Sequence, residues 1–474
     1  MTTWLPDLSD GAGPIYLRLA DNIETAINEG TLAPGTKLPP QRNLAFDLGV
    51  TIGTISRAYS LIHERGLVSG EVGRGTYVND RQAAAAAPSS KPINPENPFG
   101  STRVSSEVAG HIVLNGTAAP NIGQQEVVNA HIAAIMAEHP NDITDYTRGF
   151  PKGWVEAGTR WLSQGDWSPK PAGIVATLGA HAAVMSVIGA MTAPGDRIVF
   201  EPVTYSQVSR AAVLNGRRVS LVDIDEHGIV PDDFERVCAQ QHPKMIFVMS
   251  CAQNPTCTVL SLERRKAIAE IAKRYNVWIV EDNLYGAMRS DGIPLIAELA
   301  PDQTFLVGGL SKSVAAGLRG GWVACPPHFA ARVRVAHKML TGGLPFLLAE
   351  LSARLVNSGD ADDIRHDCVQ EIIKREAIVR QTFTGLEFNS APEIAFAWVK
   401  LPEPWLSGTF RSAAVKESVF IDDEDEFKPG RTERIFHRVR VSFSLPKSHA
   451  ELKQGLGILR RLLDNGTAGY DSVG

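Results

Sequence analysis

The chain has 474 residues, of which 44% are hydrophobic and 21% are charged, and its formal net charge is −5. The length indicates two or more domains, the composition is that of a globular protein, and the mild acidity excludes polyanion binding through overall charge. Residues 1–13 lack the pattern of a signal peptide, and the apolar stretch 182–193 is too short to span a membrane. We therefore expect a cytoplasmic protein that could bind nucleic acid only through a local patch.

The cysteines indicate neither a disulfide framework nor a zinc site. They form no C-x-x-C pair, and none lies near histidines at the spacing of zinc ligands. We therefore expect reduced, mostly buried thiols and no metal centre. The residues concerned are Cys238, Cys251, Cys257, Cys325 and Cys368.

The first eighty residues are predicted to form three helices and a hairpin. Apolar residues at helical spacing favour one helix over 15–27, a second over 41–48, and a third from a Thr51 cap to about Arg65. The stretch 67–78 alternates around glycines, which indicates two paired strands. This order of elements is typical of a winged helix-turn-helix, and we assign it to residues 1–78.

A change in composition separates this part from the rest of the chain. Residues 79–99 contain an alanine run and four prolines, which favours a linker, assigned to 79–110. From 111 to 474, helices such as 262–275 alternate with short apolar strands, predicted at 197–200, 245–249, 278–280 and 304–307. The alternation predicts an α/β domain with a mostly parallel sheet, followed by a smaller α+β domain.

The segment 38–78 resembles the GntR family of bacterial transcription regulators. It contains L-P-x-x-R, L-A-x-x-L-G-V, a threonine at the start of the third helix, R-A-Y and G-x-G-T-x-V. The resemblance implies binding of double-stranded promoter DNA, with phosphate contacts at the second helix, the third helix in the major groove and the hairpin tip near the minor groove. The DNA contacts would come from Arg42, Thr51, Thr54, Arg57 and Arg74, whereas Ile52 replaces an arginine of many members.

A second resemblance, from about His111 to the C-terminus, is to fold type I aminotransferases. The stretch GGLSK ends at Lys312, and GLRGGW places Arg319 seven residues further on. In that family the lysine holds pyridoxal 5′-phosphate covalently, and the arginine binds the phosphate of the cofactor. The same resemblance implies that Asp282 pairs with the pyridinium nitrogen of the cofactor. This pairing keeps the nitrogen protonated, so that the ring can accept electrons.

Other motifs of this family follow in the expected order. The phosphate would also be held by the loop Gly179, Ala180 and His181, which opens a helix, and by Ser311. Arg440, in R-x-S-F, would bind a substrate carboxylate through two parallel hydrogen bonds. Tyr285 and Asn254 would hydrogen-bond the phenolic oxygen of the cofactor, and Tyr205 would stack on its ring face. Tyr146 would reach the cofactor phosphate of a partner subunit, which implies a homodimer.

The chain departs from the family pattern at several positions. Ala180 and Gly309 stand where hydroxyl residues are usual, so two phosphate contacts would be missing unless His181 or serines replace them. Cys257 replaces a usual glycine. The acidic run 422–426 replaces a Pro-Gly turn, and we expect it to be a solvated loop.

A GntR-type reader, a linker and an aminotransferase-like domain in this order resemble the MocR subfamily of transcription regulators. The resemblance implies that the cofactor domain senses a small amino compound, or pyridoxal phosphate itself. The alternative is an active aminotransferase with an accessory DNA-binding domain, for which Lys312, Asp282 and Tyr285 would be the catalytic residues. The sequence leaves transaminase activity open.

Overall fold

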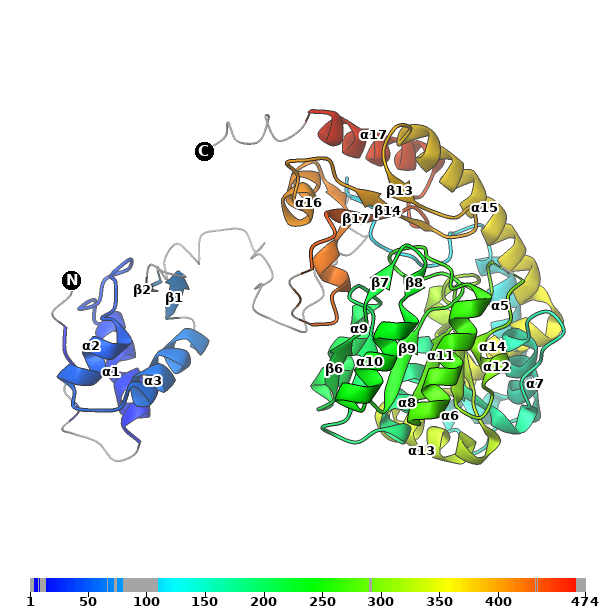
Figure 1. The fold of residues 1–474 in the computed structure, drawn as a ribbon, viewed down its shortest axis with the longest axis horizontal. Helices are drawn as coiled ribbons and strands as arrows, with labels where there is room; N and C mark the ends of the chain where they lie inside the picture. Colours follow the sequence, from blue (N-terminus) through cyan, green and yellow to red (C-terminus); the bar gives the residue numbers. More distant parts are fainter. Residues whose placement is uncertain are drawn as a thin grey trace. The chain divides into compact units, whose positions relative to one another are not determined.

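A computed structural model describes residues 4–6, 8, 14–65, 67–71, 75–79, 110–289, 292–430, 432 and 434–465. The chain divides into two compact units, Met1–Asn97 and Pro98–Gly474 (Figure 1). All but the two end residues of the predicted linker 79–110 lie outside the described residues, so its boundaries stay a prediction.

The first unit is a winged helix-turn-helix, as predicted. It contains α1 (Ile15–Asn28), α2 (Gln41–Asp47), α3 (Ile52–Glu64), and the antiparallel strands β1 (Val68–Glu71) and β2 (Gly75–Val78). Thr51 caps α3, because its hydroxyl accepts a hydrogen bond from the Thr54 amide at 3.3 Å. The predicted cap therefore fixes where the third helix begins.

The core of this unit lies between the three helices. Leu19 and Ile23 of α1, Leu44 of α2, and Ile55 and Ile62 of α3 are all fully or almost fully buried in one cluster. The spacing of four residues in α1 and of seven in α3 puts each pair on a single helix face. The hydrophobic periodicity of the sequence is thus what orients the third helix in the unit.

The second unit contains a seven-stranded mixed sheet. Its order is β4 (Ile174–Thr177), β12 (Gly321–Ala324), β11 (Thr304–Gly309), β10 (Trp278–Asp282), β9 (Met245–Val248), β5 (Arg197–Phe200) and β6 (Arg218–Leu221). Only β12 runs antiparallel to its neighbours within this sheet. The prediction of a mostly parallel sheet is confirmed.

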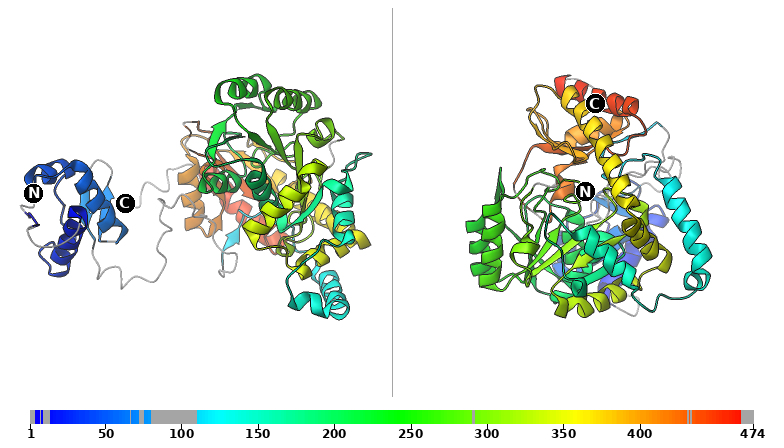
Figure 2. Two further views of the ribbon diagram at one scale, coloured as in Figure 1. Left: turned by 90° about the horizontal axis from the view of Figure 1, so that it is seen from below. Right: turned by 90° about the vertical axis from the view of Figure 1, so that its right-hand side faces the viewer.

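Helices cover both faces of this sheet (Figure 2), which explains why its strands are continuously apolar. In β9, Phe247 faces the cluster built on α8 (Gly179–Met191). Its neighbour Ile246 faces the cluster built on α10 (Pro231–Gln241) and α11 (Leu262–Tyr275). The apolar stretch 182–193 supplies most of α8, and none of the described helices is long and apolar enough to cross a membrane.

A smaller α+β part, drawn mostly in gold, orange and red in Figure 1, completes the second unit. Its sheet has the order β13 (Phe388–Asn389), β14 (Phe396–Lys400), β17 (Arg438–Ser442), β16 (Asp422–Asp423). Beside it, β3 (Ile112–Val113) pairs with β15 (Val419–Phe420). The helices are α15 (Asp360–Thr382), α16 (Ser407–Lys416) and α17 (His449–Asn465).

The remaining elements surround the large sheet. They are α5 (Gln125–Glu138), α6 (Pro140–Thr144), α7 (Lys152–Leu162), α9 (Ser206–Leu214), α12 (Ile296–Leu299), α13 (Ala330–Thr341), α14 (Phe346–Ser358), β7 (Ile224–Asp225) and β8 (Gly228–Ile229). As expected, all five cysteines are buried.

The core of the first unit leads to a stability prediction. Replacing Ile55 by alanine should destabilise that unit by about 2 to 5 kcal/mol, because a fully buried side chain leaves a cavity. Hydrogen exchange of the full chain should show faster exchange in α1 and α3 and unchanged exchange in β9 to β11. The exposed neighbour Ser56→Ala is the control, and equal loss of protection in β9 to β11 would contradict the independence of this core.

Candidate functional site

A cavity at the carboxyl ends of the central strands collects most of the predicted residues. Ligands commonly bind at this edge of an α/β sheet because loops from several strands meet there. The predicted residues that line the cavity are Ala180, His181, Tyr205, Asn254, Asp282, Tyr285, Ser311, Lys312, Arg319 and Arg440. Gly179 lies next to Ala180, so only Tyr146 of the predicted cofactor and substrate residues is distant from this group.

Asp282 reaches the cavity because it ends β10, and side chains alternate along a strand. Burial raises the pKa of Asp282 to about 6, whereas the Leu284 amide and the charge of Lys312 favour the ionised form. Glu281 points to the other face, where it accepts hydrogen bonds from the Ser250 hydroxyl and from two amides at the start of α12. Of these adjacent carboxylates, only Asp282 is available to a ligand.

Lys312 follows β11 and approaches the cavity from the neighbouring strand. Its Nζ donates a hydrogen bond to Thr117 Oγ1 at 2.8 Å, and Thr117 also lines the cavity. Sequence reasoning did not identify Thr117, because it lies 195 positions away in a segment without a motif. The structure thus supplies a partner that holds the lysine amine in the cavity.

The start of α8, together with Arg319 and His181, is the part of the cavity that suits an anion. No side chain caps this helix, so no capping group competes for its first backbone amides. The positive end of the helix dipole lies at the same place, and both features favour an anion. Arg319 adopts a left-handed conformation with φ 52°, and a Cβ added to Gly179 would lie 3.6 Å from its guanidinium carbon. The buried Nδ1 of His181 has no hydrogen-bond partner among the described residues, and burial and Arg319 lower the pKa of His181.

The missing hydroxyl at Gly309 has a steric reason. A Cβ at Gly309 would lie 2.8 Å from the carbonyl oxygen of Gly320, closer than real Cβ atoms approach. A Cβ at Gly321 would likewise lie 3.1 Å from the amide nitrogen of Ala180. Strands β11 and β12 thus pack closely against the start of α8. At this end of the cavity, backbone takes the space that a serine side chain would need.

Aromatic side chains form the walls of the cavity. The rings of His181 and Tyr205 meet edge to face, with centroids 6.2 Å apart. Tyr205 Oη donates a hydrogen bond to Gln207 Oε1 at 2.9 Å, and the ring of Tyr285 packs against Phe396. Their predicted contacts with the cofactor remain predictions.

Cys257 shows why glycine is usual at its position. Its φ is 61°, in the left-handed region that side chains with a Cβ disfavour. The thiol is buried, and its Sγ lies 3.6 Å from the Phe396 carbonyl oxygen. Contacts with the small sheet therefore hold this strained turn, next to Asn254, in place.

Arg440 projects from β17 into the cavity and is fully buried. Its Nη1 donates to Asn254 Oδ1 at 2.8 Å, and its Nη2 donates to the Asn115 carbonyl oxygen at 3.0 Å and to Asp422 Oδ2 at 2.5 Å. The guanidinium that was predicted to bind a substrate carboxylate is thus already paired with Asp422 of the same chain. Neither Asn115 nor Asp422 was among the predicted site residues.

The expectation that 422–426 is a solvated loop is wrong. Asp422 and Asp423 form β16, Glu424 and Glu426 lie in a single 3-10 turn, and all four are buried. Each finds a positive partner, because buried carboxylates are costly unless paired. The other pairs are Asp423 with Arg411, Glu424 with Lys428, and Glu426 with Arg210.

Tyr146 does not lie in the cavity of its own chain. It follows α6 and is 86% exposed. It lines a surface pocket together with residues of α6, other residues of its own loop and Phe346 of α14. An exposed position is compatible with the predicted contact in a partner subunit, which remains a prediction.

The predicted DNA-contacting residues cluster around the start of α3 and along α2. Arg42, Thr51 and Arg57 are exposed and Thr54 is partly exposed, whereas Arg74 lies outside the described residues. The Arg57 guanidinium lies 5.2 Å from the Tyr16 ring centroid, which limits its movement without removing its charge. The first half of α3, the predicted recognition helix, therefore presents Arg57 together with Ile52, which is 50% exposed.

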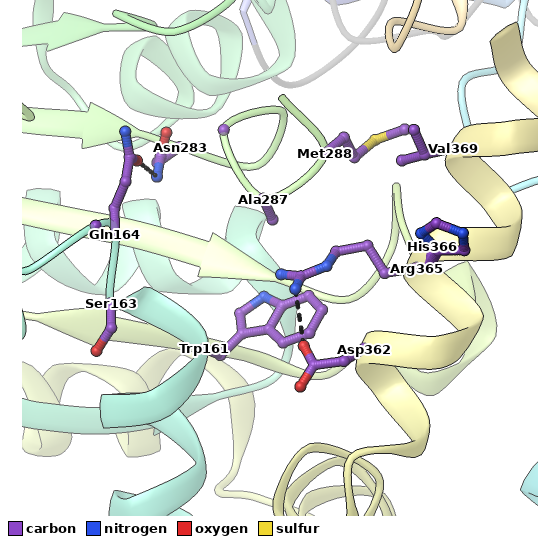
Figure 3. Close-up of a pocket in the computed structure, with 12 residues that line it drawn as sticks. Trp161, Ser163, Gln164, Asn283, Ala287, Met288, Asp362, Arg365, His366 and Val369 are labelled. Atoms are coloured by element: carbon purple, nitrogen blue, oxygen red, sulfur yellow. Dashed lines mark hydrogen bonds and ion pairs between the residues drawn. The ribbon is translucent and has the colours of Figure 1, made fainter. Parts of the chain in front are cut away.

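A second pocket includes Asn283, the residue directly after β10, and carries different chemistry (Figure 3). Arg365 stacks on Trp161 and forms an ion pair with Asp362 at 2.8 Å, and Asn283 faces Gln164 (Figure 3). The pocket contains none of the predicted site residues, and its charges neutralise each other. The first cavity is therefore the better candidate for chemistry.

Two family models match the chain. The model described as "Aminotransferase class I and II" matches residues 141–423, and "Bacterial regulatory proteins, gntR family" matches residues 15–78. The uncharacterized HTH-type transcriptional regulator YdeF of Bacillus subtilis strain 168 is 30% identical, over 98% of this chain and 97% of its own length.

Aminotransferases also resemble part of the chain. Aromatic-amino-acid aminotransferase 1 of Thermococcus litoralis is 26% identical, over 61% of this chain and 73% of that enzyme. The crystal structure of an archaeal alanine:glyoxylate aminotransferase superposes with a TM-score of 0.68 at 22% identity, covering 75% of this chain and 91% of that one. The fold of the second unit is therefore that of fold type I aminotransferases.

The cavity fits pyridoxal phosphate, the cofactor that this family implies. It has a buried carboxylate for the ring nitrogen, an amine for the aldehyde carbon, and an uncapped helix start with Arg319 for the phosphate. His181 lines the cavity at the start of the same helix, and its Nδ1, which has no hydrogen-bond partner among the described residues, could supply the phosphate hydrogen bond that the methyl group of Ala180 cannot make.

The raised pKa of Asp282 predicts how cofactor affinity depends on pH. Above about pH 6 the carboxylate is ionised and can pair with a protonated ring nitrogen; below it the carboxyl group is neutral and that attraction is lost. Cofactor affinity, measured by equilibrium dialysis, should therefore fall as the pH drops through about 6. In the variant Asp282→Asn, cofactor affinity should not show this fall near pH 6, because asparagine does not ionise. An identical pH dependence in both proteins would contradict the assignment.

Proposed function

Because the chain belongs to the aminotransferase class I and II family and carries a GntR-type reader, we propose that it is a MocR-type transcription regulator that senses an amino compound. It binds double-stranded promoter DNA through the first unit. The second unit holds pyridoxal phosphate and responds to a small amino compound or to the cofactor itself. The observation that carries the proposal is the convergence of Lys312, Asp282 and Arg319 in one cavity of a chain that also has the reader.

Each residue of the cavity is assigned to one part of the cofactor. When bound, the cofactor supplies an electrophilic carbon and an electron-accepting ring. Lys312 would hold it covalently, with Thr117 orienting the amine, and Asp282 would keep the ring nitrogen protonated. Tyr285 and Asn254 would contact the phenolic oxygen, and Tyr205 would stack on the ring face. The phosphate would be bound by Gly179, Ala180, His181, Ser311 and Arg319.

The regulator acts as a cytoplasmic homodimer in this proposal. Tyr146 is exposed outside its own cavity, as it must be to reach the cofactor phosphate of a partner subunit. A dimer would also present two readers to two half-sites of an operator. The cytoplasm is where promoter DNA is reached and where buried thiols stay reduced.

Transaminase activity is the second candidate function. Lys312, Asp282 and Tyr285 all line the cavity, so the groups that a transaminase needs are present. The purified protein, given amino donors and 2-oxo acids, distinguishes the two functions through product formation. Turnover without any ligand effect on DNA affinity would favour an enzyme with an accessory reader.

Lys312 should be the covalent attachment point. Purified wild-type protein should show a visible absorption band that borohydride removes while fixing the cofactor to the peptide that contains Lys312. The variant Lys312→Ala loses the only nitrogen assigned to this bond, so it should release the cofactor on denaturation after borohydride. Mass spectrometry of the digested protein reads out the adduct, and the same adduct in the variant would refute the attachment.

DNA affinity should depend on the arginines of the reader. The variant with alanine at Arg42, Arg57 and Arg74 should bind a duplex of its own promoter region more weakly, with the salt dependence reduced by about one unit of slope for each phosphate that is no longer neutralised. Arg236→Ala is the control, because it removes an exposed arginine from the second unit. Unchanged affinity of the triple variant in a filter-binding titration would place the reader elsewhere.

A further inference from the structure

The cavity carries a buried ion pair where an amino-acid substrate would place its carboxylate. Arg440 and Asp422 are 0% and 2% exposed, and Arg440 Nη2 lies 2.5 Å from Asp422 Oδ2. The side-chain oxygen of Asn254 and the backbone carbonyl oxygen of Asn115 accept further hydrogen bonds from the same guanidinium. The charge of this arginine is therefore neutralised within the chain.

Backbone pairing holds the two partners together. Asp422 and Arg440 are directly opposite each other in the antiparallel ladder of β16 and β17, so their side chains leave the sheet on the same face. Asp423 extends the same ladder opposite Val439 and is anchored by Arg411. Asp422 is thus a strand residue with a fixed partner and not a side chain of a mobile loop.

A ligand carboxylate would meet two obstacles here. It would have to compete with Asp422 for the same guanidinium, and it would place a second negative charge beside a buried one. Among the described residues that line the cavity, the other side chains with a fixed positive charge are Lys312 and Arg319. Lys312 is needed for the cofactor aldehyde and Arg319 for its phosphate, so neither serves a ligand carboxylate.

We propose that Asp422 determines ligand specificity, and that the cavity takes a primary amine without a carboxylate on its amine-bearing carbon. This inference rests on the proposed function, since it concerns the ligand of the cofactor site. It changes the expected role of Arg440: the arginine positions Asn254 and β16 and does not bind the carboxylate of an amino acid. The ligand class is then that of simple amines, diamines or amino alcohols.

Matched ligands test the proposal on the full chain loaded with cofactor. L-Alanine and ethylamine differ only by a carboxylate, as do L-lysine and cadaverine. The wild type should respond to each amine at a concentration at least roughly tenfold lower than to its amino acid, which corresponds to about 1.4 kcal/mol. The measurements are the visible absorption of the bound cofactor and the shift in thermal unfolding midpoint.

Variants locate the effect at Asp422. Asp422→Asn keeps the size and a hydrogen-bonding group but frees the charge of Arg440, so the preference for amines should fall at least roughly tenfold as amino acids begin to bind. Asp425→Asn is the matched control, because Asp425 lies in the same run with its side chain 72% exposed, and it should behave as wild type. The unfolding midpoint without ligand shows whether either variant is damaged.

The outcomes separate this inference from the proposed function. Equal or better wild-type binding of the amino acids would overturn the role of Asp422 while leaving a sensor intact, and this arm needs no variant. An unchanged preference in a folded Asp422→Asn would also overturn it. If neither amines nor amino acids alter the cofactor spectrum or the unfolding midpoint, the proposed sensing of an amino compound fails together with the inference.

Discussion

The alternation of side chains along buried parallel strands decides which groups reach the cavity. Glu281 and Asp282 are adjacent at the end of β10, yet one binds amides of α12 on one face and the other enters the cavity. Asp282 is in register with Val307 of β11, and Lys312 follows that strand closely. A single pair of parallel strands therefore brings a carboxylate and an amine together, and the other parts of the site are arranged around these two groups.

Buried charge is the second constraint, and the second unit meets it by giving its buried guanidinium groups partners within the chain. Arg265 donates to four backbone carbonyls and ties the loop before α12 to β9 and α11. Arg375 donates to the carbonyls of Phe443, Ser444 and Pro446 and fixes the chain after β17. Arg440 follows the same rule with Asp422, so the acidic run is part of the core's charge balance.

Features set by neighbours in the sequence could be predicted, and features set by distant strands could not. The Thr51 cap, the bounds of α11, the strand β5 and the order of the cofactor motifs depend on local spacing. The hydrogen bond of Lys312 with Thr117 and that of Arg440 with Asn115 join segments far apart in the chain. The run 422–426 resembled a solvated loop because the partners of its carboxylates are mostly outside it, and only the fold brings them together.

An enzyme and a sensor make different demands on an arginine such as Arg440. A transaminase gains from a cation kept available for the carboxylate of its substrate, because a two-pronged contact orients the reacting carbon. Where folding has already joined the guanidinium to Asp422 and Asn254, its charge stabilises the small sheet and the turn at Asn254 instead. A sensor needs only a ligand whose binding free energy differs between two states. The amine and cofactor chemistry at Lys312 can provide that difference without a carboxylate contact, so the internal ion pair is compatible with recognition and unfavourable for the turnover of amino acids.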